Sequence, residues 1–220
     1  CGDILGDKLK FNDTVVSDFQ SSKSKLELHF WKGTKIDSDK TNEDQLSSII
    51  NQLNSKKEWL RRQPIDALIG LIGEASKKWL KAEGDLEKMK EKGLAFLANW
   101  SNSEHLNRIS TIGLRGNRQY IDNFLPLNDS RKQFLKANQR GLVSHWLAGN
   151  VQVLGMFALI QSILTKNVNL LKISSKDDGV FADLLKVFEG VSYTTKGGYS
   201  IKGDKLLETI GIVYFSHEDK

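Results

Sequence analysis

GLVSHWLAGNVQVLGMFALIQSILTKNVNLLKISSKD, residues Gly141 to Asp177, is the stretch that decides the fold. Gly141 to Leu147 is a short apolar run that suits a buried strand, and Val168 to Ile173 is a second β-rich run. Between them, Val151 to Leu164 is apolar nearly all round and predicts a buried helix. Apolar strands joined by an apolar helix favour a parallel sheet covered on both faces, with any ligand site at the carboxyl ends of its strands. The fold class is therefore α/β.

Polar side chains stand at both predicted strand ends. Asn150 follows Gly149 at a strand-to-helix turn, where its carboxamide N–H and nearby backbone N–H groups can stabilise an oxygen that becomes negative. Lys172 lies one residue inside the second strand end and can reach a phosphate or a ribose hydroxyl. Ser174 and Ser175 can cap the next helix or hydrogen-bond a sugar. Each has an ordinary alternative, because Asn is a common turn residue and an isolated Lys is usually a solvated charge.

The chain after Asp177 continues the same pattern. Ser174 to Asp177 is expected to open a further helix, whose apolar positions are Val180, Phe181, Leu184, Leu185 and Phe188. Ile210 to Phe215 (IGIVYF) predicts a third strand of the sheet, with an outer edge that we expect to be unpaired. The glycines around Tyr199 predict a turn between short strands, since no phosphate-loop motif is present.

Together these residues resemble a known family. The motif G-L-V-x-H-x-x-A-G-N-V, a long apolar helix and L-T-K-N-V-N-L-L-K-I-S-S-K-D are similar to the nucleotide-binding half of the aldehyde dehydrogenase superfamily, and most of all to LuxC-type acyl-CoA reductases. The resemblance implies that Asn150 helps to stabilise the oxyanion of a thiohemiacetal and that Lys172 contacts the adenosine ribose. Cofactor contacts are implied at His145, Gly149, Ser174 and Ser175.

The resemblance also implies an activity for the parent protein. An acyl-CoA or acyl-protein thioester reductase would make a long-chain aldehyde with NADPH, through an acyl-enzyme on a cysteine. Cys1 is the only cysteine of the sequence and is far from the motif. We therefore expect the nucleophile in a part not present here and no activity from this fragment alone. An acyl-transferase or synthetase partner and a homo-oligomer are expected.

Three regions are predicted along the chain. Residues 1–35 form a small β arm with strands at Lys8 to Phe11 and Leu26 to Trp31. Residues 36–127 are a helical region, interrupted at Pro64. Residues 128–220 form a partial NAD(P)-binding, Rossmann-like domain of the aldehyde dehydrogenase type, which Asn128 to Gln139 links to the helices.

Charge leaves two other kinds of function open. The net charge of +5 and the pI near 9.1 fit polyanionic ligands such as NADPH and acyl-CoA, and equally fit weak nucleic-acid contact. The basic and aromatic segment Lys56 to Arg62 favours a solvated helix face, because Glu58 and further acidic residues are interspersed. The same surface interpretation is favoured for most members of an arginine group, namely Arg108, Arg115, Arg118, Arg131 and Arg140. The alternatives are thus a catalytically inactive NAD(P)-binding or interaction module, or a nucleic-acid-binding helical protein.

Targeting signals and metal motifs are not seen. The charged start, Asp3 to Asp18, does not fit a signal peptide, and Val151 to Leu164 is too short to span a bilayer core of roughly 30 Å. One cysteine excludes an internal disulfide and is consistent with the cytoplasm. No metal site is expected.

Overall fold

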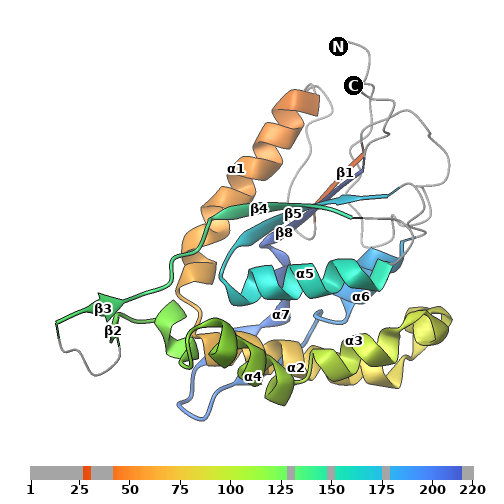
Figure 1. The fold of residues 1–220 in the computed structure, drawn as a ribbon. Helices are drawn as coiled ribbons and strands as arrows, with labels where there is room; N and C mark the ends of the chain where they lie inside the picture. Colours follow the sequence, from red (N-terminus) through yellow and green to blue (C-terminus); the bar gives the residue numbers. More distant parts are fainter. Residues whose placement is uncertain (1–26, 31–41, 128–131, 148–151, 175–178, 215–220) are drawn as a thin grey trace.

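A computed structural model describes residues 27–30, 42–127, 132–147, 152–174 and 179–214. Its centre is a four-stranded sheet in the order β1-β8-β5-β4, with helices on both faces (Figure 1). Helix α1 (Asn42–Arg61) packs on one face, where Ile49 and Leu53 lie against Gly211. Helix α5 (Gln152–Leu164) covers the other face and separates the sheet from α2 (Ile65–Lys81). The α/β fold class is confirmed.

Three parallel strands form the part of the sheet that the sequence predicted. They are β4 (Leu142–Trp146), β5 (Val168–Ile173) and β8 (Ile210–Tyr214). Strand β5 lies between β4 and β8 and is buried on both faces, except at the half-buried Lys172. A strand in this position needs apolar residues on both sides, which explains the continuous run VNLLKI. The strand–helix–strand order predicted for this segment is confirmed. The expectation that Gly141 to Leu147 forms a buried strand was wrong, because β4 is at the edge of the sheet and its residues are half-buried or exposed.

The outer edge of β8 is paired, so the expectation of an unpaired edge was wrong. Strand β1 (Glu27–Phe30) runs antiparallel to β8, with Glu27 opposite Tyr214 and Phe30 opposite Gly211. The strand predicted at Leu26 to Trp31 therefore exists, but it completes the main sheet. Pairing between segments this far apart in the chain leaves no periodic signal in either one, because periodicity reports only the faces of a strand. The strand predicted at Lys8 to Phe11 lies outside the described residues.

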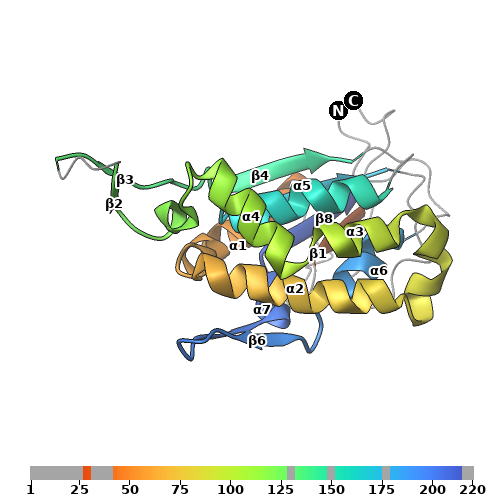
Figure 2. The ribbon, with the colours of Figure 1, turned by 60° about the horizontal axis from the view of Figure 1, so that its bottom comes forward.

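Most of the segment between residues 42 and 121 is helical, and its most buried helix is α2. Helix α1 ends at Arg61, and α2 begins directly after Pro64, whose fixed φ and missing N–H suit a helix start. The remaining segments are the 3₁₀ helix η2 (Gly84–Lys92), α3 (Leu94–Trp100), α4 (Ser103–Gly113) and the 3₁₀ helix η3 (Arg118–Ile121). Helices α3 and α4 lie alongside α2 (Figure 2), and α3 also contacts α5, where the rings of Phe96 and Phe157 meet. The core is thus continuous from the sheet through α5 to α2.

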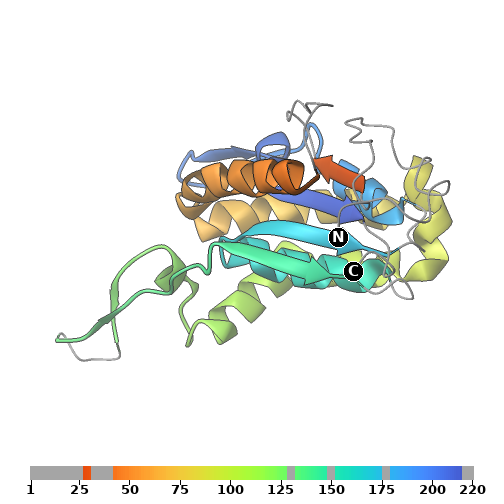
Figure 3. The same cartoon turned by 90° about the horizontal axis from the view of Figure 1, so that it is seen from above.

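Two short hairpins and two short helices complete the fold. Strands β2 (Leu125–Pro126) and β3 (Phe134–Leu135) pair within a segment that extends away from the body (Figure 3). Strands β6 (Ser192–Thr194) and β7 (Ser200–Lys202) pair around Gly198, whose φ of +83° suits glycine, and this confirms the predicted glycine turn. The two helices are α6 (Val180–Lys186) and α7 (Gly203–Leu207). Helix α6 is the helix that the sequence predicted after β5.

Gly203 is a position where a larger residue cannot fit. A Cβ atom there would lie 2.0 Å from the carbonyl oxygen of Phe188, and the Gly203 N–H also donates to the Val191 carbonyl at 2.8 Å. Because the obstacle is backbone, Gly203→Ala is expected to lower the free energy of unfolding by about 1–3 kcal/mol. The matched control is Gly113→Ala in α4, where no heavy atom lies within 4 Å. It is expected to be neutral or to stabilise by up to about 1 kcal/mol. Urea unfolding measures the free energy of unfolding of both variants. Equal changes in Gly203→Ala and Gly113→Ala would contradict the packing at Gly203.

Within the described ranges, no helix is long and apolar enough to cross a membrane.

Candidate functional site

The carboxyl ends of β4 and β5 bring three of the predicted site residues into one region. His145 and Lys172 are each one residue from the end of their strands, and Ser174 directly follows β5. The pairing continues one residue past β4, since the Leu147 N–H donates to the Lys172 carbonyl at 2.9 Å. Gly149, Asn150 and Ser175 lie outside the described residues, so their predicted roles stay predictions.

Lys172 and Trp146 share one face of the sheet. They are register partners in neighbouring parallel strands, and such partners project to the same side. Lys172 is half-buried, whereas the Trp146 side chain is 74% exposed. An aromatic ring and an amine at a strand end are groups that can contact a base and a phosphate or hydroxyl, respectively. Trp146 carries no functional signal in the sequence, because a Trp in a short apolar run looks like a core residue.

Gly155 sets how closely α5 approaches the strand ends. A Cβ atom at this position would lie 2.8 Å from Cε2 of Phe181 and 3.0 Å from the Leu147 methyl groups. Phe181 belongs to α6 and is buried, so the absent side chain lets α5, α6 and the end of β4 meet. The first turns of α5 are thereby held close to the site.

His145 is on the opposite face from Trp146 and contacts a buried polar residue. Its Nε2 atom lies 2.9 Å from Oδ1 of Asn169, which is completely buried in β5. The Asn169 amide also donates from Nδ2 to the Asn167 carbonyl at 2.7 Å, and its backbone N–H donates to the Thr209 carbonyl at 2.9 Å. A buried polar side chain needs such partners, because an unpaired one costs about 1–3 kcal/mol. The signal available in the sequence was Asn169 itself, a polar residue with apolar neighbours on both sides in the run VNLLKI.

Asn167 ties the start of β4 to the end of α5. Its Oδ1 accepts from the Gly141 N–H at 2.9 Å, while its Nδ2 donates to Oγ1 of Thr165 at 2.8 Å. In the opposite direction, the Val168 N–H donates to the Gly141 carbonyl at 2.9 Å. The turn at Asn167, which the sequence indicated only as the end of a helix, therefore also fixes the register of β4 against β5.

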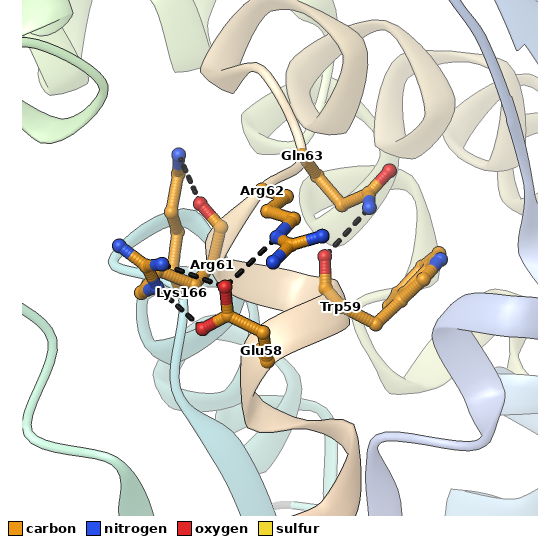
Figure 4. A network of polar contacts seen from close by, with 6 residues as sticks. All are labelled: Glu58, Trp59, Arg61, Arg62, Gln63 and Lys166. Atoms are coloured by element: carbon orange, nitrogen blue, oxygen red, sulfur yellow. Dashed lines mark hydrogen bonds and ion pairs between the residues drawn. The ribbon is translucent and has the colours of Figure 1, made fainter.

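The basic segment of α1 has ion pairs of its own. Glu58 accepts from Arg61 at 2.6 and 2.7 Å and from Arg62 at 2.8 Å (Figure 4). These side-chain hydrogen bonds lower the pKa of Glu58 to about 2. Trp59 packs against the core instead of standing beside the cations. The segment thus has the geometry of a helix surface with internal charge pairing.

The described members of the arginine group are surface residues or form an ion pair of their own. Arg118 donates to Asp66 at 2.7 Å, which links η3 to the first turn of α2. Arg108, Arg115 and Arg140 are exposed, and Arg131 lies outside the described residues. Among the residues that the structure describes, no group of three or more His, Cys, Asp or Glu side chains could hold a metal ion.

The fold places this chain in the class of α/β proteins. Three of the four strands of its main sheet are parallel, and polar residues stand at their carboxyl edge. Comparison with known families makes the assignment specific. The family model described as acyl-CoA reductase (LuxC) matches residues 60–220, so the chain belongs to the LuxC family.

Curated relatives carry a consistent description. The long-chain acyl-protein thioester reductase of Photobacterium phosphoreum is 29% identical over 104 residues, covering 47% of this chain and 19% of the relative. The reductase of the same description from Photorhabdus laumondii is 40% identical over 62 residues, 28% of this chain and 12% of the relative. That of Photorhabdus luminescens is 27% identical over 146 residues, 64% of this chain and 28% of the relative. The matched part thus spans less than a third of each of these relatives.

Proposed function

We propose that the intact protein is a fatty acyl reductase that converts a long-chain acyl thioester, on coenzyme A or on a protein, to the aldehyde. Membership of the LuxC family supports this proposal, as do relatives described as long-chain acyl-protein thioester reductases. The observation that carries it is the position of His145, Lys172 and Ser174 at the carboxyl edge of parallel strands, where α/β sheets bind ligands.

NADPH is the cofactor that we propose for this edge, and it would supply the reducing hydride. Lys172 offers a cationic donor that is partly shielded from water, and Ser174 offers a hydroxyl two residues further along the chain. These donor types suit the phosphates and ribose hydroxyls of a dinucleotide. The residues present therefore fit the group. In this proposal Lys172 binds the adenosine ribose, with His145, Gly149, Ser174 and Ser175 around the cofactor.

The covalent step needs a thiolate, and the part of the chain that the structure describes contains no cysteine. A cysteine sulfur would attack the thioester carbonyl and expel the thiol, so that the acyl group is carried on the enzyme until it is reduced. Cys1 is the single cysteine of the sequence and lies outside the described residues. We propose that the nucleophile comes from another part of the protein. Asn150 would then donate a hydrogen bond to the acyl oxygen as negative charge develops.

Replacing Lys172 with alanine is expected to weaken NADPH binding by roughly 10- to 100-fold, because a charge-assisted hydrogen bond contributes about 1.5–3 kcal/mol. Titration calorimetry on the intact protein measures the dissociation constant. Lys136→Ala is a suitable control, since Lys136 stands over the Phe124 ring beside β3, in the segment that extends away from the sheet. A wild-type dissociation constant in Lys172→Ala would rule out the proposed contact.

Asn150→Ala is expected to lower reductase turnover by roughly 10²-fold or more while the affinity for NADPH is kept. The reason is that the carboxamide is proposed to act on the reacting oxygen and not on the cofactor. Single-turnover reduction of a long-chain acyl-CoA by the intact protein separates this step from cofactor binding. If turnover is unchanged, Asn150 does not stabilise the oxyanion.

A further inference from the structure

The contact between His145 and Asn169 determines where the imidazole proton lies. The carbonyl oxygen of Asn167 can only accept a hydrogen bond, so the group that Asn169 turns toward it must be the amide NH₂. The other end of the same amide, Oδ1, faces Nε2 of His145 at 2.9 Å and is likewise only an acceptor. Nε2 must therefore carry the proton. A neutral imidazole with a proton on Nε2 has its acceptor lone pair on Nδ1.

The surroundings make this arrangement rigid. Asn169 is completely buried, and its backbone N–H and side-chain NH₂ are both used within the protein. Turning its amide over would direct Oδ1 at the Asn167 carbonyl, which pairs two acceptors and leaves two buried groups without a donor. The side chains of His145 and Asn169 lie on the same face of the sheet, since Val143 and Asn169 are register partners. The tautomer of His145 thus follows from the fold.

We infer that Asn169 is a positioning residue that holds His145 as the Nε2–H tautomer, so that Nδ1 accepts a hydrogen bond from a ribose hydroxyl of the bound dinucleotide. The inference rests on the proposed function for the identity of the ligand. Neutral Nδ1 presents a lone pair, which is unsuited to the phosphate oxygens and requires an O–H or N–H group instead. Lys172 lies on the other face of the sheet and offers only donors, so the two residues would contact different kinds of atom at the same strand edge.

Two measurements on the intact protein test the two halves of this inference. The first is ¹⁵N NMR of histidine-labelled protein at alkaline pH, where free histidine is neutral. His145 in the wild-type protein is expected to show a protonated Nε2 and an unprotonated Nδ1, and Asn169→Leu is expected to show both tautomers. A protonated Nδ1 in the wild-type protein, or an unchanged single tautomer in Asn169→Leu, would overturn the positioning role.

The second measurement is the dissociation constant for NADPH in a matched pair of His145 variants. An asparagine oxygen takes nearly the place of Nδ1, so His145→Asn is expected to bind within roughly twofold of wild type. His145→Leu loses the acceptor and is expected to bind roughly 3- to 10-fold more weakly, which corresponds to one hydrogen bond. This pair of variants tests the acceptor role of Nδ1 even if Asn169→Leu does not fold. Equal affinity in His145→Leu and wild type, with Lys172→Ala still weakened, would overturn the acceptor role alone.

Failure of the proposed function gives a different result. In that case the wild-type protein would not bind NADPH, which overturns the ligand assigned to Nδ1, whereas the NMR measurement would still decide whether Asn169 fixes the tautomer.

Discussion

Replacing Lys166 with methionine is expected to lower the free energy of unfolding by about 3–5 kcal/mol, because it leaves a largely buried carboxylate without its partner. Lys166 is 3% exposed, and its Nζ atom donates both to Oδ1 of Asp122 and to the Arg61 carbonyl, the latter at 3.0 Å. The second oxygen of Asp122 accepts from the Ile65 N–H at 3.0 Å. One buried pair therefore joins the end of α1, the start of α2 and the turn between α5 and β5.

Urea unfolding of Lys166→Met measures this effect, and Lys77→Met is the matched control. Lys77 pairs with Glu74 at 2.7 Å, but its side chain is 67% exposed, so its loss is expected to cost less than about 1 kcal/mol. Combining Lys166→Met with Asp122→Asn is expected to cost less than the sum of the single changes, since the neutral amide no longer leaves a charge unpaired. Strict additivity, or a Lys166→Met loss no larger than that of Lys77→Met, would contradict the buried pair.

Replacing Trp79 with alanine is expected to cost about 3–5 kcal/mol, the range for emptying a large core position. Trp79 has no exposed surface, and its ring meets Phe188 edge-to-face at a centroid distance of 5.8 Å. Its Nε1–H donates to the Leu184 carbonyl at 3.0 Å, so the side chain links α2 to α6. Packing and hydrogen bonding are thus lost together.

A phenylalanine variant separates these two contributions. Trp79→Phe keeps most of the apolar volume but leaves the Leu184 carbonyl without its donor, and it is expected to cost about 1–3 kcal/mol. Leu80→Ala, at the adjacent position of α2, is the control, since Leu80 is 59% exposed and the change is expected to be within about 0.5 kcal/mol of neutral. If Trp79→Ala and Leu80→Ala have similar effects, α2 is not packed as described.

Much of the fold was predictable from sequence because the decisive elements are strongly apolar. The run VNLLKI coincides with β5, and Val151 to Leu164 coincides with α5 to within one residue. Proline at position 64 marked the break between α1 and α2, because it lacks an N–H. These elements could be located because composition and periodicity report the structure of a single continuous segment.

Contacts between distant segments were not predictable in the same way. The pairing of β1 with β8 joins residues far apart in the chain, and the Lys166–Asp122 pair looks like two surface charges in the sequence. At the candidate site, His145, Lys172 and Ser174 were predicted with the help of the family motif, and their position at the strand ends followed from the strand pattern, whereas Asn169 was not predicted. Its role depends on which neighbour its amide meets across the sheet, and this is set by strand register.

The most direct test of the account is the reduction of a long-chain acyl-CoA by the intact protein, followed as NADPH consumption together with the aldehyde formed. We predict one aldehyde for each NADPH consumed and a loss of roughly 10²-fold in Asn150→Ala. An intact, folded protein that binds NADPH but forms no aldehyde from acyl-CoA or acyl-protein thioesters would contradict the assignment as a reductase and would favour an inactive NAD(P)-binding module.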